Sequence, residues 1–243
     1  MRRAIQGVTR PGKIVAVLAS HFDLEKAARL RRLPDLFELR LDALCHDLPA
    51  VERMLRELRA PLIITARHPA EGGLHDLSAS RRRALLEQFL PHAAYVDIEL
   101  RAAHSFRSIL DAAHVLHIQR IISVHDFRNA PTAQRLDQWA AEAQSLRPDI
   151  LKIVTGAEDA AQLEVLAEFF ERSRAKLALS IMGVGRLGRK SRLYFAQHGS
   201  ALNYAHLGNS QIAGQLSLLE MRRALTATTR RRNSAPSRFD HRT

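Results

Sequence analysis

Short apolar runs rich in β-branched residues recur along this chain, and each is followed by an amphipathic stretch of helical period. Runs of this length predict strands, and the stretches between them predict helices. The predicted strands are residues 13–20, 36–44, 61–68, 94–100, 119–127, 149–156, 176–183 and 201–208. The predicted helices are residues 24–33, 48–59, 78–92, 102–117, 130–147, 157–173, 189–199 and 217–227.

This alternation of strand and helix constrains the topology of the chain. Strands joined through crossover helices lie parallel. Eight such units in about 220 residues predict an α/β fold, a single-domain (β/α)8 TIM barrel, whose site lies at the C-terminal ends of the strands. A doubly wound open sheet is the alternative.

No segment rich in Gly, Pro or Ser interrupts residues 13–226, so we expect one barrel domain there. Residues 1–12 are then an N-terminal extension, and residues 227–243 are a basic tail without periodicity, which we expect to be disordered. Thr132 and Asp159 stand where helix N-caps are expected.

Composition narrows the class of protein. Hydrophobic residues make up 46% of the chain, enough for a packed core, and no apolar run approaches the ~18–20 residues that cross a bilayer. The single cysteine, Cys45, suits a reducing cytoplasm. The net charge of +12 lies partly in the tail and partly on helix faces, without interleaved aromatic residues. This pattern favours a solvated surface over a nucleic-acid site.

Charged residues repeat at a spacing of two within five consecutive predicted strands. Because side chains alternate between the faces of a strand, such residues share one face. The residues on this face are Glu38, Arg40 and Asp42; Thr65 and Arg67; Asp97 and Glu99; Ser123 and His125; and Ile150, Lys152 and Val154. The opposite face, predicted to pack against helices, carries Leu39, Leu41, Ile64, Ala66, Ile98, Val124, Leu151 and Ile153.

So many charges on one interior face predict a functional site. An unpaired buried charge costs several kcal/mol, so the set must compensate itself or bind a polar ligand. Metal ligation is disfavoured because a lysine and two arginines accompany the carboxylates, and no HExxH or CxxC spacing is present. We therefore expect no metal.

Residues 183–188, GVGRLG, match the dinucleotide pattern GxGxxG. Gly208 stands where an acidic residue is expected, and the segment does not belong to an N-terminal βαβ unit. We therefore expect no dinucleotide cofactor, and favour an anion site at the helix start that follows.

Lys152 is unusual because only five of the 37 Lys and Arg residues are lysines. An amine attacks a carbonyl only when neutral, and an exposed lysine with a pKa of ~10.4 is protonated at neutral pH. Burial in an apolar strand beside arginines favours the neutral amine. The iminium formed with a ketone makes the adjacent C–H acidic, and His125 on the neighbouring strand is the natural proton carrier.

Several motifs in their order along the chain resemble type I 3-dehydroquinate dehydratase, the Schiff-base enzyme of the shikimate pathway. The resemblance covers residues 13–226 and implies a barrel lyase that dehydrates 3-dehydroquinate to 3-dehydroshikimate without a cofactor. The motifs are FELRLDAL (37–44), PLIITARHPAEGG (61–73), YVDIEL (95–100), IISVHDF (121–127), DILKIVTGAED (149–159), SIMGVGRLGRKSRL (180–193) and AGQLSL (213–218).

The resemblance also implies roles for individual residues. Lys152 would form the imine, His125 would transfer protons, and Glu71 would orient that histidine. The substrate-binding residues implied are Glu38, Arg40 and Arg67, Arg192 for the substrate carboxylate, and Gln211 and Gln215 on the closing loop. Family members are commonly dimers, so we expect a homodimer with a small-molecule substrate. We expect it in the cytoplasm, which the single cysteine suits, with neither a membrane nor a nucleic-acid partner.

The chain departs from the family pattern at four places. Val17 replaces a small hydroxyl residue, Ser180-Ile181-Met182 stands where the family has Met-Ser-Met, Tyr204-Ala205 stands where it has Phe-Gly, and Gln211 replaces a serine. These changes bear on ligand preference and loop closure rather than on reaction class. Three alternatives stay open: another Schiff-base lyase or aldolase, a non-catalytic barrel that binds a quinate-like ligand, and nucleic-acid binding through the tail.

Overall fold

A computed structural model describes residues 12–210 and 212–233, the last seven by their backbone alone. Its strands form one parallel sheet in the order β7-β6-β5-β4-β3-β2-β1-β8-β9. The strands are β1 (Lys13–Leu18), β2 (Leu36–Arg40), β3 (Leu62–Thr65), β4 (Tyr95–Glu99), β5 (Gln119–Asp126), β6 (Ile150–Gly156), β7 (Leu179–Val184), β8 (Leu202–His206) and β9 (Leu216–Ser217).

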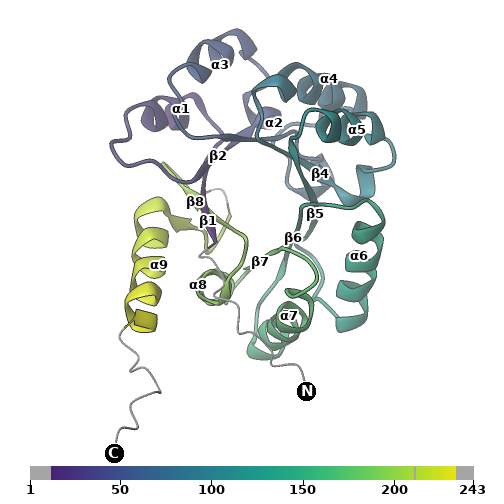
Figure 1. Ribbon diagram of the computed structural model, residues 1–243, viewed down its shortest axis with the longest axis vertical. Coiled ribbons are helices and arrows are strands. Elements are labelled where there is room, and N and C mark those ends of the chain that lie inside the picture. The colour runs from purple at the N-terminus through teal and green to yellow at the C-terminus, as the bar shows by residue number, and fades with distance from the viewer. Residues whose placement is uncertain (1–11, 211, 234–243) are drawn as a thin grey trace, which may run out of the picture.

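The helices lie outside this ring of strands (Figure 1). They are α1 (His21–Ala28), α2 (Leu41–Leu44), α3 (Leu48–Leu55), α4 (Ala79–Phe89), α5 (Arg107–Val115), α6 (Ala133–Ser145), α7 (Ala160–Ser173), α8 (Gly188–His198) and α9 (Leu218–Asn233), with the 3₁₀ turns η1 (Pro69–Glu71), η2 (Leu90–His92) and η3 (Leu100–Ala102). As predicted, Thr132 and Asp159 cap α6 and α7 through their side chains.

The predicted barrel is confirmed, because strands β1 to β7 are neighbours in sequence order and β8 returns beside β1. The seam lies between β7 and β8, where the described strands share no ladder. There the backbone N–H of Ala201 donates to Leu179 O at 2.7 Å, and the Ser180 hydroxyl donates to Leu202 O at 2.8 Å. The doubly wound sheet is therefore wrong.

Most segment boundaries differ from the sequence-based expectation by a few residues. The strand predicted to reach residue 44 ends at Arg40, and α2 follows, because the Asp42 carboxylate turns to accept the backbone N–H groups of Arg67 and Leu74. The two-residue β9 was not predicted. Helix α9 continues to Asn233, past the predicted domain end at residue 226, while residues 1–11 and 234–243 lie outside the described residues.

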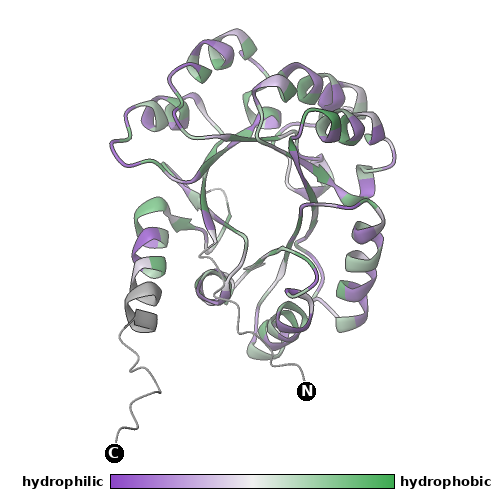
Figure 2. Ribbon diagram, in the orientation of Figure 1, coloured by the Kyte–Doolittle hydropathy of each residue, from purple (hydrophilic) through white to green (hydrophobic). Residues whose placement is uncertain are grey.

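Two apolar layers flank the sheet, as the alternation predicts. The layer between strands and helices contains every strand residue that was predicted to pack against the helices, among them Leu39, Ile98 and Ile153. A smaller cluster, including Val15, Ile121 and Ile150, fills the lower barrel interior. Figure 2 accordingly shows hydrophobic residues, in green, along the strands and on the inner helix faces. The polar interior positions are thus left at the carboxyl ends of the strands.

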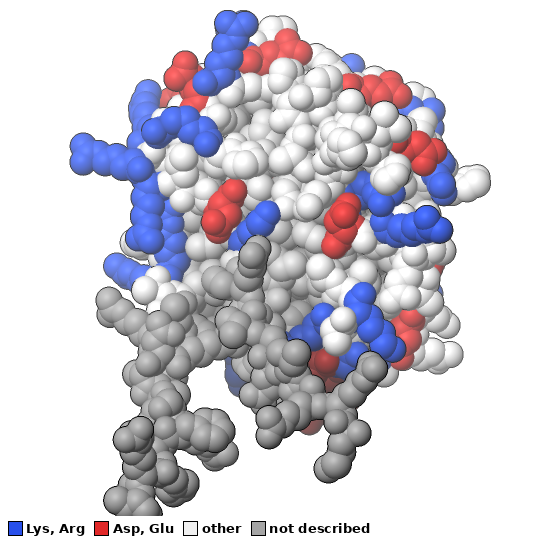
Figure 3. All heavy atoms as spheres, in the orientation of Figure 1, with Lys and Arg blue, Asp and Glu red and all other residues white. Residues whose placement is uncertain are grey.

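The basic residues are spread over the surface in view. Figure 3 shows them gathered along the edge near α1 and α9 and otherwise interspersed with acidic residues. None of the helices within residues 12–210 and 212–233 is long and apolar enough to span a bilayer.

Candidate active site

A pocket opens at the carboxyl ends of the strands and encloses about 510 Å³ of space, the solvent at its mouth included. Every predicted site residue lines it except Gln211, which lies outside the described residues. Those that line it are Glu38, Arg40, Arg67, Glu71, His125, Lys152, Arg192 and Gln215. The pocket also contacts Val17, Gly72, Phe127, Val154, Met182, Tyr204 and Ile212.

Lys152 stands at the base of this pocket and is only 4% exposed. Its Nζ lies 3.0 Å from Asp97 Oδ2 and 3.3 Å from Glu38 Oε1. The ring of Tyr204 covers it at 4.0 Å from the centroid. The sequence suggested arginines beside this amine, whereas the structure places two carboxylates and an aromatic face against it.

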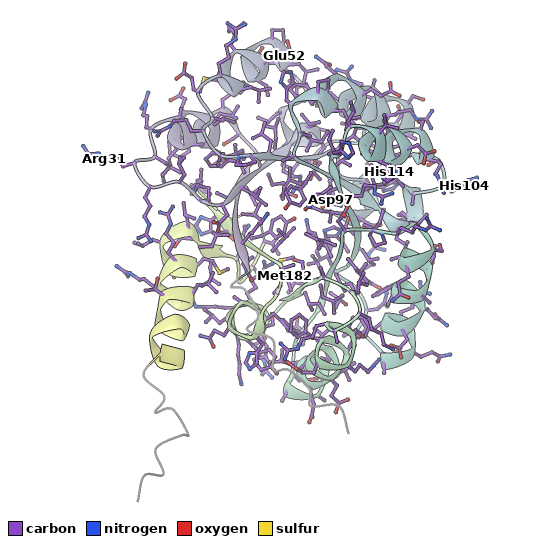
Figure 4. All side chains as sticks on the ribbon, in the orientation of Figure 1. Arg31, Glu52, Asp97, His104, His114 and Met182 are labelled. Carbon is purple, nitrogen blue, oxygen red and sulfur yellow. The ribbon has the colours of Figure 1, made fainter. Side chains whose placement is uncertain are left out.

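Asp97 holds Lys152 and Arg67 together. Its carboxylate accepts two hydrogen bonds from the Arg67 guanidinium, at 2.9 and 3.2 Å, as well as the bond from Lys152. Burial disfavours its charge, but Arg67 and Lys152 outweigh burial and hold the pKa of Asp97 well below its usual range. Figure 4 shows Asp97 inside the ring of strands, together with Met182. Asp97 was predicted to face inward, yet no role was predicted for it.

Arg67 is fixed by carboxylates on β4. Besides Asp97, it donates to Glu99 Oε1 at 3.0 Å and to the Ser123 hydroxyl at 2.8 Å. Burial opposes its charge, but Asp97 and Glu99 raise the pKa of Arg67 well above its ordinary value. Both terminal nitrogens of the guanidinium therefore already have partners, and the side chain contributes a rigid wall to the pocket.

His125 and Glu71 form a pair across the pocket. The Glu71 Oε2 lies 3.0 Å from His125 Nδ1 and accepts the backbone N–H of His125 at 3.0 Å. Burial, with the charges of Arg67 and Lys152, holds the pKa of His125 well below its ordinary value. The imidazole is therefore neutral at neutral pH, and Nε2 remains available for proton transfer.

Glu71 comes from η1, not from a strand. The turn ends at Gly72, whose φ of 86° is left-handed and whose Cβ position would meet the Phe127 ring at 3.1 Å, so glycine is required there. Burial, reinforced by Glu99, raises the pKa of Glu71 to about 7. Its ionisation therefore changes near neutral pH.

Arg192 approaches from α8 and is 4% exposed. Its guanidinium forms no hydrogen bond or ion pair within residues 12–210 and 212–233, and its Nε is a buried orphan. Burial lowers its pKa to about 10. A buried cation without a counter-ion implies an anionic ligand in the pocket.

The remaining predicted residues line the pocket wall. Arg40 makes two hydrogen bonds to Asp42, at 2.9 and 2.8 Å, and a third to Gly72 O. Glu38 accepts from the Thr65 hydroxyl at 3.0 Å. These bonds hold the Glu38 carboxylate and the Arg40 guanidinium in the wall of the pocket.

The GVGRLG loop does not hold an open anion site in the described structure. The backbone N–H of Arg186 donates to Glu158 Oε2 at 2.9 Å, so a carboxylate of the chain already occupies this position. The cation that faces the pocket is Arg192, further along α8.

The family model for type I 3-dehydroquinase matches residues 15–232. The chain belongs to this family. It is 31% identical over 193 residues to a 3-dehydroquinate dehydratase of Desulfotalea psychrophila, covering 77% of this chain and 84% of that protein. It is also 30% identical over 182 residues to a chloroplastic bifunctional 3-dehydroquinate dehydratase/shikimate dehydrogenase of Arabidopsis thaliana, covering 74% of this chain but only 30% of that longer protein.

The fold is shared with a solved family structure. The crystal structure of 3-dehydroquinate dehydratase from Geobacillus kaustophilus superposes with a TM-score of 0.81 at 24% identity, covering 91% of this chain and 92% of that chain. The single-domain barrel is therefore the architecture of this type I family member.

Proposed function

We propose that this protein dehydrates 3-dehydroquinate to 3-dehydroshikimate in the shikimate pathway, through a Schiff base on Lys152. The observation that carries the proposal is that Lys152, the His125–Glu71 pair and the uncompensated Arg192 open onto one pocket. Membership of the type I 3-dehydroquinase family and the names of the relatives support the substrate. The reaction is that of a hydro-lyase and uses neither a metal nor an organic cofactor.

In the first step, the neutral Lys152 amine attacks the ring ketone, and the ketone oxygen leaves as water to give an iminium. The two protons that Nζ loses on passing from ammonium to iminium leave with that water, while Asp97 and Glu38, within hydrogen-bond distance, position Nζ. Because Arg67 fixes Asp97, the amine is held in one position.

In the second step, His125 Nε2 removes a proton from the carbon beside the iminium, whose positive charge makes that C–H acidic. The protonated imidazole then gives its proton to the departing hydroxyl, which leaves as the second water. One water molecule hydrolyses the iminium and restores Lys152, so the net reaction releases one water.

Binding would use the polar wall of the pocket. Arg192 pairs with the substrate carboxylate, a planar group that suits a guanidinium. Glu38 and Arg40 contact ring hydroxyls, with Arg67 behind them, and Gln215 contributes from the loop after β8. The family resemblance alone adds Gln211 to this set.

Sodium borohydride tests the covalent step. Incubation with dehydroquinate and borohydride should add one reduced adduct to the peptide that carries Lys152, detected by mass spectrometry. An adduct on another lysine, or no adduct during active turnover, would contradict the Schiff base on Lys152. Formation of a conjugated enone, followed by ultraviolet absorbance, separates dehydration from an aldolase or another lyase reaction and from a barrel that only binds.

Arg192→Met is expected to raise KM by about 100-fold, because charge-assisted hydrogen bonds to the substrate carboxylate are lost. The free energy of unfolding should not fall, since the side chain is a buried cation without a partner among the described residues. Steady-state kinetics and urea unfolding measure the two effects. Arg189→Met, at an exposed arginine paired with Glu220, is the matched control and should leave KM unchanged.

The pH profile of kcat/KM should rise through about pH 7. Below the pKa of Glu71, its carboxyl group donates to His125 Nδ1 and places the imidazole proton on Nε2, where it blocks proton abstraction. Above that pKa the carboxylate accepts from Nδ1, and Nε2 can act as the base. Glu71→Gln should remove this rise, and a flat profile in the unmodified enzyme would refute the role of Glu71.

We also expect a homodimer, as the family resemblance implies, in the cytoplasm, which the single cysteine suits. Light scattering of the purified protein during size-exclusion chromatography measures the mass directly. A monomer at micromolar concentration would contradict the dimer.

A further inference from the structure

A cysteine and two histidines meet where the loops after β2 and β3 come together. Cys45 and His46 follow α2, and His75 lies in the loop after η1. One ligand atom from each lies within 4.8 Å of the other two, and the two imidazoles meet edge to face at 4.4 Å. Within residues 12–210 and 212–233, none of these three side chains makes a hydrogen bond or an ion pair.

One thiolate and two imidazoles are ligands typical of Zn²⁺ and Co²⁺. Tetrahedral Zn²⁺ with bonds of about 2.0–2.3 Å needs neighbouring ligand atoms about 3.4–3.6 Å apart. The ligand atoms lie within 4.8 Å of one another, so the separations exceed this spacing by at most about 1.4 Å, which side-chain rotation covers. His46 is exposed and leaves the fourth position to solvent.

The cluster joins two segments that already contact each other. Asp42, three residues before Cys45, accepts the backbone N–H of Leu74, the residue before His75. Arg40 donates to Gly72 O in the same loop. A metal ion would add a stronger link between these segments, close to Glu71.

We propose that Cys45, His46 and His75 bind a divalent ion of the Zn²⁺ type, which ties the loop that carries Glu71 to the segment after β2. The site is separate from the pocket that holds Lys152 and takes no part in the chemistry there. Its role is to hold the Glu71 loop in place.

Cobalt absorbance tests this site. Cys45 is the only cysteine of the chain, so a thiolate-to-Co²⁺ charge-transfer band can arise only from it. The full chain, without a histidine tag, should develop this band with one equivalent of Co²⁺, and Zn²⁺ but not Mg²⁺ should abolish it.

Variants identify the ligands. Cys45→Ser should lose the band, and His46→Gln and His75→Gln should each weaken Co²⁺ binding at least tenfold. His104→Gln, at an exposed histidine outside the cluster, is the control and should bind Co²⁺ normally. Absence of the band, or an unchanged affinity in His75→Gln, would overturn the proposal.

A separate observation concerns Tyr204, one of the departures from the family pattern. Its side chain lines the pocket and is 4% exposed, and its hydroxyl has no hydrogen-bond partner among the described residues. Buried hydroxyl groups nearly always have a partner, so this one is available to a ligand. Burial, with the charges of Glu38 and Asp97, raises the pKa of Tyr204 well above its ordinary value, so the hydroxyl stays protonated.

We infer that the Tyr204 hydroxyl donates a hydrogen bond to the oxygen of the carbonyl compound that Lys152 engages. This inference rests on the proposed function, because the ring of Tyr204 lies 4.0 Å from the amine that would attack that compound. A phenylalanine keeps the aromatic face over Lys152 but supplies no donor.

Tyr204→Phe should lower kcat/KM and the rate of borohydride trapping by about tenfold. The thermal midpoint should rise or stay the same, because an unsatisfied buried hydroxyl is removed. Tyr194→Phe, on α8 outside the pocket, is the matched control. If the unmodified protein does not turn over dehydroquinate, the proposed function fails. If it does, and Tyr204→Phe equals it in both rates, the inference on Tyr204 fails.

Discussion

Lys152→Met is expected to lower kcat/KM by on the order of 10⁴-fold or more and to abolish borohydride trapping, because the nucleophile of the covalent step is gone. Methionine keeps the length of the side chain, so the pocket keeps its shape. Asp97 retains Arg67 as a partner, so the free energy of unfolding should fall by at most about 3 kcal/mol.

A second substitution separates charge from nucleophilicity. Lys152→Arg keeps a cation between Asp97 and Glu38 but cannot form an imine, so it should be as inactive as the methionine variant while losing less stability. Lys176→Met, at an exposed lysine, is the control and should keep full activity. If Lys152→Met keeps more than about one hundredth of the activity, covalent catalysis by Lys152 is excluded.

The fold was predictable because the position of each strand and helix follows from a local pattern of apolar and polar residues. Each strand is an apolar run and each helix an amphipathic stretch, and their alternation determines a parallel barrel. The end of β2, by contrast, was not predictable, because it depends on contacts between residues that are far apart in the sequence. Asp42 turns the chain into α2 by accepting N–H groups from Arg67 and Leu74, more than twenty residues away, and a local pattern does not contain such partners.

The site residues likewise fall into those that local periodicity predicts and those that it does not. Two-residue spacing placed Glu38, His125 and Lys152 on the inner face, and the pocket contains all three. Glu71 and Arg192 lie on η1 and α8, so strand periodicity could not predict them, and only the family resemblance pointed to them.

The sequence could not show which of the inward-facing charged side chains pair with one another. The inward charges of five strands can be partnered in several ways, and the choice depends on distances across the barrel. The structure shows that Asp97, on β4, is shared by Arg67 and Lys152. This sharing makes Asp97 the residue on which the order of the site depends.

Asp97→Asn should therefore cost about 3–5 kcal/mol of unfolding free energy at neutral pH, because two buried cations lose their common counter-charge. Asp137→Asn is the matched control, since Asp137 forms an ion pair with Arg172 but is 57% exposed, and it should cost no more than about 1 kcal/mol. Urea unfolding of both variants measures the difference, and a cost below about 1 kcal/mol for Asp97→Asn would contradict the shared role.

The pH dependence gives the same prediction a second test. The pKa of Asp97 is depressed in the folded protein, so its contribution to stability is fully present above the unfolded-state pKa of about 3.9 and is lost as pH falls. The stability difference between the unmodified protein and Asp97→Asn should thus be constant from neutral pH to about pH 5 and shrink below about pH 4. A difference that grows on acidification would mean that burial, rather than Arg67 and Lys152, dominates the ionisation of this carboxylate.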